Sequence, residues 1–344
     1  MPGALIRSDE RTPPSPPRGG NVDEDVQALR GLCVVAGVCI IAGEGVGVVT
    51  KPGLPVGVGE PAVNPVPREM LLINLSEEFQ RCGVEGTVSL TDSSQSRKLP
   101  TRSFVWLGGH DGAPSATGAV LEVEITVPRG VELARHTLNP RLGIVGGISI
   151  LGTTGLVKPF SHEAYEETIL AALTVARSNG CNQVVLSTGG KSEKLAQQAL
   201  PELPGEAFVQ IADFFAYSVR TAAHMGFSGI VHSVFFGKAV KMACGHAYTH
   251  AHKVALDLEP LAASAREAGY GADLCGELAS ANTAQHALDI LLANGAHDLI
   301  EGVAQQALAQ SVRIAETVRD VRLLLFDQKG SLLADVSHRG EQLG

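Results

Sequence analysis

Residues 181–235, CNQVVLSTGGKSEKLAQQALPELPGEAFVQIADFFAYSVRTAAHMGFSGIVHSVF, decide the fold class of this chain. Short apolar runs in this stretch predict buried strands, and the longer segments between them predict helices. The predicted strands are 184–186, 208–211 and 230–234, and the predicted helices are 191–200 and 213–225. Strands that alternate with helices favour a mainly parallel sheet with both faces covered. We therefore expect a three-layer α/β arrangement here.

Both flanks of this stretch continue the alternation. Ser161 is a suitable N-cap for a helix upstream, and Gly180 is the kind of residue that ends one. The remaining elements expected in this half are a strand over 142–151, helices over 161–178, 254–266, 278–294 and 297–316, and a closing hairpin of 321–327 and 331–334. We assign residues 139–344 to one α/β domain with a helical C-terminal part.

The first part of the chain has a different character, and we expect an α+β domain over residues 29–138. Its Gly/Pro-rich segment 43–67 holds five prolines, which exclude a regular helix there. The expected elements are a strand near 32–42, a helix over 68–81, a polar excursion over 87–118 and a half-exposed strand over 121–127. Residues 1–28 are rich in proline and charge, so we expect a disordered segment.

Composition and charge limit the classes of partner. The chain has 344 residues and a formal net charge of −9, which argues against a nucleic-acid or anionic-membrane partner. The apolar run 32–43 is too short for a membrane span, which needs ~20 residues. None of the six cysteines forms a CxxC pair, so free thiols in a reducing cytoplasm are the simplest interpretation. The sequence leaves homo-oligomerisation open.

Two glycine- and proline-rich segments carry the functional signal. They read GEGVGVVTKPGLPV…GEPAVNPVPREM over 43–70 and NPRLGIVGGISILGTTGLVKP over 139–159. Glycines let backbone amides approach a ligand closely, and basic side chains accompany both segments. Neither has the order of residues of a P-loop or a dinucleotide-binding loop. On composition alone, close-packed turns at strand ends remain the alternative.

These two segments resemble the signature segments of the CbiD family, the cobalt-precorrin-5B C1-methyltransferases. A weaker similarity covers residues 236–241, FGKAVK, with the Thr249–His250 pair. The resemblance implies a two-domain fold with a mainly parallel C-terminal sheet. It also implies methyl transfer from S-adenosylmethionine to ring carbon 1 of cobalt-precorrin-5B, giving cobalt-precorrin-6A on the anaerobic route to cobalamin.

The resemblance also suggests which residues bind each ligand. The macrocycle carries several carboxylates, so basic side chains near the signature segments are candidate contacts. The candidates for substrate binding are Lys51, Arg68, Arg141, Lys158, Lys238, Lys241 and His250. The candidates for the S-adenosylmethionine site are Glu44, Gly45, Gly47, Gly146, Gly147, Thr153 and Thr154. Which segment serves which ligand stays open, and no covalent nucleophile is expected.

The sequence also offers three alternative interpretations. His246 and His250 have helical i, i+4 spacing, but no HExxH-type motif surrounds them, and the macrocycle already holds the cobalt. We therefore expect no protein-bound metal. A non-catalytic tetrapyrrole-binding protein that has lost the family's N-terminal segment is the second hypothesis. A nucleotide-handling enzyme that uses residues 43–47 is the third.

Overall fold

The computed structural model describes residues 32–35, 38–81, 86–88, 102–105, 121–151, 162–249 and 256–340. Its largest sheet has five described strands, and β10 (Gln183–Ser187), β11 (Phe208–Gln210) and β12 (Gly229–Phe235) confirm the strands predicted in 181–235. The remaining two are β13 (Asp320–Phe326) and β14 (Leu332–Arg339), the predicted closing hairpin.

The spatial order of the strands is β11–β10–β12–β13–β14. The pairs β10–β11, β10–β12 and β12–β13 are parallel, whereas β14 is antiparallel to β13. The expected α/β class is therefore confirmed, with a mixed sheet. Short loops and helical crossovers join the parallel strands, as parallel pairing requires.

Helices cover both faces of this sheet. They are α4 (His162–Ser178), α5 (Gly190–Ala199), α6 (Phe215–His224), α7 (Phe236–Ala243) and α11 (His297–Ala315). On β12, Ser233 Oγ donates to the Ser192 carbonyl of α5 at 2.7 Å, and His232 Nε2 lies 2.6 Å from Ser311 Oγ on α11. Because successive side chains of a strand point to opposite faces, α5 and α11 lie on opposite faces.

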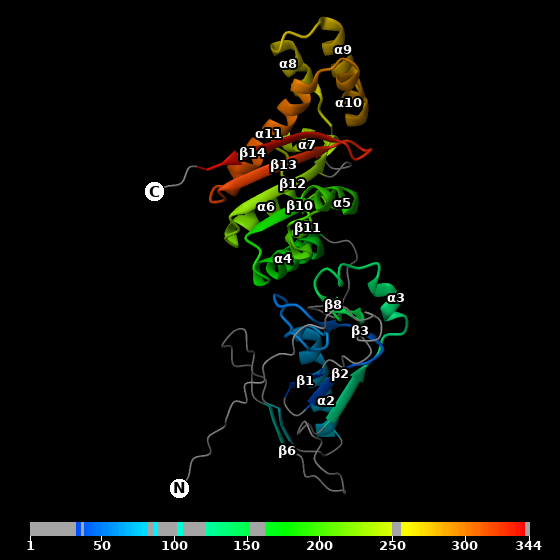
Figure 1. Ribbon diagram of the computed structural model, residues 1–344. Coiled ribbons are helices and arrows are strands. Elements are labelled where there is room, and N and C mark those ends of the chain that lie inside the picture. Colours follow the sequence, from blue (N-terminus) through cyan, green and yellow to red (C-terminus); the bar gives the residue numbers. More distant parts are fainter. Residues whose placement is uncertain are drawn as a thin grey trace.

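Three short helices lie beyond the sheet. These are α8 (Glu259–Glu267), α9 (Ala272–Ser280) and α10 (Ala284–Ala293), and Figure 1 shows them at the opposite end of the molecule from the described residues among the first 150. The predicted single helix over 278–294 is wrong, because the chain becomes extended at Ala281 and Thr283. Thr283 Oγ1 accepts the His286 amide at 3.1 Å and starts α10 as its N-cap.

The first part of the chain holds a smaller sheet and one long helix. The sheet consists of β1 (Leu32–Val35), β2 (Val38–Ala42) and β7 (Leu121–Ile125), and the helix is α2 (Pro65–Arg81). Ile40 and Leu72 are buried in a cluster that joins this sheet and helix. The α+β character expected for this part is thus present. A separate pair, β5 (Gly86–Val88) and β6 (Arg102–Val105), is antiparallel within the predicted excursion.

Three sequence expectations about residues 32–151 are corrected. The single strand expected near 32–42 is the antiparallel pair β1–β2. The helix starts at Pro65 rather than residue 68, since proline is tolerated in the first turn, where no intrahelical amide bond is lost. The single strand over 142–151 is replaced by β8 (Ile144–Val145) and β9 (Gly147–Ile148), because Gly146 between them has φ +85°.

The two signature segments pair with each other. The first contains β3 (Gly45–Val46) and β4 (Val48–Val49); β3 is parallel to β9, and β4 is antiparallel to β8. A short helix, α3 (Gly130–Ala134), and a 3₁₀ turn, η1 (Gly205–Ala207), complete the described elements. The paired segments contact the large sheet through α4, where Asn179 Nδ2 donates to the Pro52 carbonyl at 3.3 Å.

Some expectations lie outside the described residues. These are the disordered segment 1–28, most of the excursion 87–118, the Ser161 cap, and the residues Thr153, Thr154, Lys158 and His250. The stop at Gly180 is confirmed, because this glycine has φ +83° directly after α4. None of the described helices is long and apolar enough to cross a membrane.

Candidate functional site

The carboxyl ends of β10 and β12 form the place where ligands bind in sheets of this kind. The chain leaves β10 towards α5 and β11, and it leaves β12 towards α7 and β13 on the other side. In open α/β sheets, ligands bind where the strand order reverses in this way, and we use the name crevice for this position between the carboxyl ends of β10 and β12. The turn before α5 borders this place on one face, and the first turn of α7 borders it on the other.

A group of four polar side chains lies beside the start of α7. Lys238 forms an ion pair with Asp213, which follows β11, and its Nζ also donates to the Thr249 carbonyl at 3.2 Å. Thr249 Oγ1 donates to Asp213 Oδ1 at 3.3 Å, and Lys241 Nζ lies 3.5 Å from the Thr249 carbonyl. We call Asp213, Lys238, Lys241 and Thr249 the α7 cluster. It brings together two of the predicted substrate residues.

The surroundings of the α7 cluster alter the acidity of its lysines. Burial, and to a lesser degree the charge of Lys241, lowers the pKa of Lys238 to about 8. Burial also lowers the pKa of Lys241. The residue before Asp213, Ala212, has φ +47°, which is unusual for a residue with a side chain. The α7 cluster is therefore a partly desolvated group in which Lys238 loses its charge around pH 8.

A second ion pair joins the second signature segment to α5. Arg141 donates through both terminal nitrogens to the two carboxylate oxygens of Glu193. The Glu193 side chain is only 4% exposed, whereas that of Arg141 is 38% exposed. Gln197 Nε2 donates to the same carboxylate at 3.2 Å. The pair holds residue 141 against the first turn of α5, beside the crevice.

The cations of the first signature segment also have acidic partners. Lys51 Nζ lies 2.5 Å from Glu206 Oε1, and this contact lowers the pKa of Glu206. Arg68 pairs with Glu60 at 2.8 Å and donates to the carbonyls of Val63 and Pro61. Arg68 thus closes the loop that precedes α2. These pairs stabilise the fold, and neither lies in the α7 cluster.

The glycines predicted for the S-adenosylmethionine site lie in close backbone contact. A Cβ on Gly147 would lie 2.3 Å from the carbonyl of Gly45, and a Cβ on Gly45 would lie 2.1 Å from the Val127 carbonyl. A Cβ on Gly47 would lie 2.4 Å from Ile144. Packing therefore explains these three glycines without a ligand. Gly146 forms the bend between β8 and β9, and Glu44 is exposed.

Several residues at the crevice were missed in the sequence. Asp213 and Glu193 fall within the predicted helices 213–225 and 191–200 and have no role among the sequence predictions, and the Thr188–Gly189–Gly190 turn is not singled out there. The sequence feature that could have indicated a ligand site is the pair Gly189–Gly190, which lies between a buried strand and a helix. The acidic partners had no local signal, because Asp213 and Lys238 are 25 positions apart.

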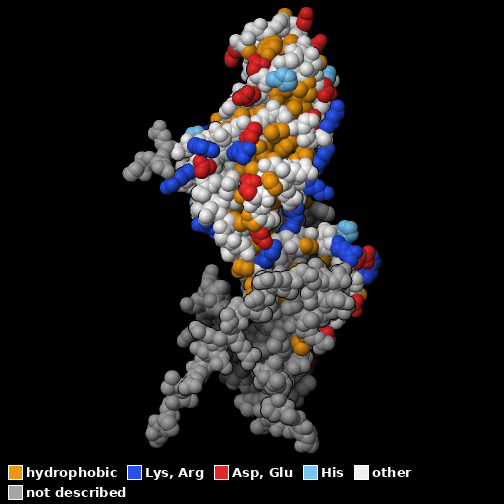
Figure 2. All heavy atoms as spheres, in the orientation of Figure 1, with side chains coloured by type: hydrophobic (Ala, Val, Ile, Leu, Met, Phe, Trp, Pro, Cys, Tyr) orange, Lys and Arg blue, Asp and Glu red, His pale blue; other side chains and the backbone are white. Residues whose placement is uncertain are grey.

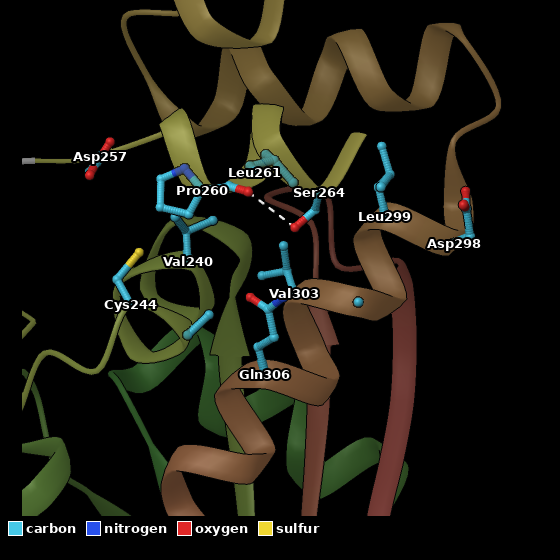
Figure 3. A pocket seen from close by; sticks show the side chains of 12 residues that line it. Val240, Cys244, Asp257, Pro260, Leu261, Ser264, Asp298, Leu299, Val303 and Gln306 are labelled. Atoms are coloured by element: carbon cyan, nitrogen blue, oxygen red, sulfur yellow. Dashed lines mark hydrogen bonds between the residues drawn. The ribbon is translucent and has the colours of Figure 1, made fainter. Parts of the chain in front are cut away.

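A separate small cavity of about 60 Å³ lies between α7, α8 and α11. Figure 3 shows Cys244, Pro260, Ser264 and Gln306 around it. Burial raises the pKa of the Cys244 thiol, so the thiol is less reactive than a free cysteine. This cavity has no cationic lining residue and lies apart from the crevice. Among the described residues, no group of three or more His, Cys, Asp or Glu is placed to hold a metal ion.

The visible face of the molecule shows how charge is distributed. Figure 2 shows acidic, basic and hydrophobic side chains interspersed over the sheet and helices, with no broad basic area on the described part of that face. An anionic ligand would therefore depend on local cations and backbone amides rather than on a general positive field.

Comparisons with known proteins cover most of the chain. The profile of the family described as CbiD matches residues 20–98 and 111–159, and that of the CbiD C-terminal domain matches residues 248–337. A protein of Nitratidesulfovibrio vulgaris named cobalt-precorrin-5B C(1)-methyltransferase is 40% identical over 96% of this chain and 76% of its own length. A protein of the same name from Priestia megaterium is 34% identical over 98% of this chain and 82% of its own length.

One solved structure is also similar in sequence. The crystal structure of a cobalamin biosynthesis protein, cbiD, from Archaeoglobus fulgidus is 24% identical to this chain. The match covers 70% of this chain and 60% of the solved chain, with a TM-score of 0.22.

Proposed function

Because the chain belongs to the CbiD family, we propose that it methylates carbon 1 of cobalt-precorrin-5B to give cobalt-precorrin-6A. The observation that carries this proposal is the extent of the similarity. Relatives with this activity in their names are 34–40% identical and align over nearly the whole chain. The family profiles also cover both the signature segments and the C-terminal helices and hairpin.

We propose S-adenosylmethionine as the methyl donor, with cobalt present only within the macrocycle. The donor supplies an electrophilic methyl group, and the nucleophile is a carbon of the macrocycle. The protein's task is then to orient two substrates and to keep water away from them. No covalent protein nucleophile is required. The described residues agree with such a role, because the crevice presents backbone amides and paired charges.

Within the crevice, we assign the macrocycle contact to the α7 cluster. Lys238 and Lys241 are partly desolvated cations on one helix turn, and Asp213 and Thr249 position them. A polyanionic substrate gains most from cations that are already held in place. Arg141 contributes from the side of α5, since more than a third of its side chain stays exposed after pairing with Glu193.

We also propose that the chain divides into two domains near residue 139. The first part, 29–138, contributes one signature segment, and the second part, 139–344, contributes the other together with the large sheet. The pairing of β3 with β9 and β4 with β8 would then be the interface between the domains. Limited proteolysis followed by co-purification of the two fragments tests this division.

The test of the proposed function is a single-turnover reaction under anaerobic conditions. Methyl-labelled S-adenosylmethionine and cobalt-precorrin-5B are mixed with the full chain, and the product is analysed by mass spectrometry. Label in cobalt-precorrin-6A at carbon 1 is the expected result. Binding of the macrocycle without methyl transfer would instead support the non-catalytic tetrapyrrole-binding alternative, which has no support from the names of the relatives.

A further inference from the structure

One buried hydroxyl in the large sheet lacks a partner. Ser187 is the last residue of β10, its side chain is fully buried, and its Oγ has no hydrogen-bond partner among the described residues. A buried hydroxyl left unpaired destabilises the folded state, so native proteins seldom keep one without a reason. Ser187 needs an explanation that the fold itself does not supply.

The direction of this hydroxyl follows from the strand register. Ser187 pairs with Ser233 of β12, and side chains of paired residues in parallel strands lie on the same face. Ser233 Oγ donates to the Ser192 carbonyl in the first turn of α5. The Ser187 side chain therefore points to the α5 face, beneath the turn that starts this helix.

The turn above Ser187 presents unused backbone donors. Gly189 is the N-cap of α5, and its amide donates to Ser192 Oγ at 3.2 Å. The amides of Gly190, Lys191 and Ser192 form the first turn, where a helix leaves its N–H groups without intrahelical partners. No described side chain accepts from these three amides. Together with the helix dipole, they favour an anion at this position.

The glycine at the N-cap is not explained by packing or by backbone conformation. A Cβ on Gly189 would meet no atom within 4 Å, and its φ of 168° is extended and open to any residue. Gly190 is similar, since its Cβ would make only an ordinary contact of 3.5 Å with Gln210. This contrasts with Gly45 and Gly147, whose Cβ atoms would collide with backbone. No described residue fills the space beside Gly189, which leaves room there for a ligand.

We propose that the Ser187–Gly190 turn is a carboxylate-binding subsite of the crevice. A ligand carboxylate accepts from the first amides of α5 on one side and, after a small movement of the turn that uncovers the hydroxyl, from Ser187 Oγ beneath. The inference rests on the proposed function, which brings two sources of this group: the amino-acid end of the methyl donor and the acid side chains of the macrocycle. The subsite lies on the α5 face of the sheet, and the α7 cluster lies on the opposite face. The two sides of the crevice therefore bind different parts of the ligands.

The test compares two ligands that differ only in the amino-acid part. S-adenosylhomocysteine carries the carboxylate, whereas 5′-methylthioadenosine lacks it. Calorimetric titration of both is carried out on the full wild-type chain and on Gly189→Ala. Gly271→Ala is the matched control, because Gly271 is the N-cap of α9 and its Cβ would also meet no atom within 4 Å. Binding of cobalt-precorrin-5B is measured in parallel from its absorption spectrum.

In Gly189→Ala, we expect affinity for S-adenosylhomocysteine to fall at least about tenfold, the size of one lost charge-assisted contact. Affinity for 5′-methylthioadenosine and the unfolding temperature should stay unchanged, as should all values in Gly271→Ala. Weakened macrocycle binding with unchanged S-adenosylhomocysteine binding would assign the subsite to a macrocycle carboxylate. Equal losses for both adenosine ligands, or no loss for any ligand, would overturn the proposal.

A second variant separates this role from a structural one. Ser187→Ala removes a hydroxyl for which the described part of the chain offers no partner, so the unfolding temperature should not fall. Affinity for the carboxylate ligand should fall about threefold to tenfold, the range of one hydrogen bond. Reduced stability with unchanged affinity would contradict the subsite. Failure of the wild-type chain to transfer methyl would instead reject the proposed function, whereas transfer with normal variants rejects the subsite alone.

Discussion

Glu193 and Arg141, 52 positions apart, form a two-point ion pair in which the carboxylate is almost fully buried. The pair connects the second signature segment to the first turn of α5. A buried carboxylate is costly unless a cation and hydrogen bonds compensate it. The contact therefore fixes the position of residues near 141 relative to the large sheet, and it makes the stability of the chain dependent on both partners.

The first prediction concerns the removal of one partner. Arg141→Met leaves the Glu193 carboxylate buried, with Gln197 as its one remaining side-chain partner among the described residues. We expect a loss of about 2–3 kcal/mol, below the range for fully buried pairs because Arg141 is partly exposed. The double variant Arg141→Met/Glu193→Met should recover most of this loss. Urea unfolding of the two single variants and the double variant measures the coupling. Additive losses would show that the pair contributes no coupling energy.

The second prediction concerns the contact between the two signature segments. Gly147→Ala places a methyl group 2.3 Å from the Gly45 carbonyl, so the backbones of β3 and β9 must separate. We expect a loss of about 2–3 kcal/mol, as for other overpacked positions. Faster hydrogen exchange at the amides of Val46 and Ile148 would locate the effect. Gly276→Ala in α9 is the control, because its Cβ meets open space.

The Gly276→Ala control should keep or slightly raise the stability, since alanine favours a helix by up to about 1 kcal/mol over glycine. If Gly147→Ala and Gly276→Ala behaved alike, the close packing of the signature segments would not explain the glycines at 45 and 147. Such a result would instead favour the direct approach of a ligand to the amides of Gly45 and Gly147.

The third prediction concerns a buried histidine. Burial lowers the pKa of His232 from 6.5 to about 3, and its Nδ1 has no partner among the described residues. Between pH 6.5 and 3, the His232 ring is therefore protonated in the unfolded chain and neutral in the folded chain. The stability that the neutral ring contributes is fully present above pH 6.5 and is lost as pH falls towards 3.

The expected slope from His232 alone is about 1.4 kcal/mol per pH unit within this window. The double variant His232→Leu/Ser311→Ala removes the ring and its hydroxyl partner together, and its free energy of unfolding should depend less on pH by that amount. His224→Leu, at an exposed position of α6, should keep the wild-type slope. Unfolding curves at pH 6, 5 and 4 decide between these outcomes.

The large sheet followed from the sequence because each strand was signalled locally. Val184, Val231 and Leu323 lie in short apolar runs, and the helices between them have their own periodicity. Elements without such a signal were missed. Helix α7 was read only as a glycine- and lysine-containing stretch, and the break before α10 depends on the cap at Thr283. Local caps and bends decide such boundaries against the overall pattern.

The candidate site was less accessible to prediction, for a physical reason. The cations Lys51, Arg141 and Lys238 were identified by charge, but the carboxylates that bind them come from distant parts of the chain. A sequence shows which residues carry a charge. It does not show which of these charges form ion pairs, because that depends on the three-dimensional structure. The same limit applies to glycine, because Gly147 is explained by packing and Gly189 is not, although both stand in Gly-Gly pairs.

The last prediction concerns Lys238 and the pH dependence of substrate binding. Its pKa of about 8 means that the side chain is an ammonium at pH 7 and is mostly neutral at pH 9. The carboxylates of the proposed macrocycle stay ionised throughout this range. We therefore expect affinity for cobalt-precorrin-5B to fall about tenfold from pH 7 to 9, the size of one charge-assisted contact. Absorption titrations under anaerobic conditions measure this.

Lys238→Arg should bind the macrocycle with less than about a twofold change over the same range, because an arginine stays protonated. Lys238→Met should bind weakly at every pH, and Lys194→Met, at an exposed position of α5, should follow the wild type. The loss of macrocycle affinity between pH 7 and 9 does not come from unfolding of the chain. The unfolded lysine keeps its proton up to about 10.5, so the contribution of Lys238 to stability rises between pH 8 and 10.5. A Lys238→Arg curve identical to the wild-type curve would remove this residue from the binding site.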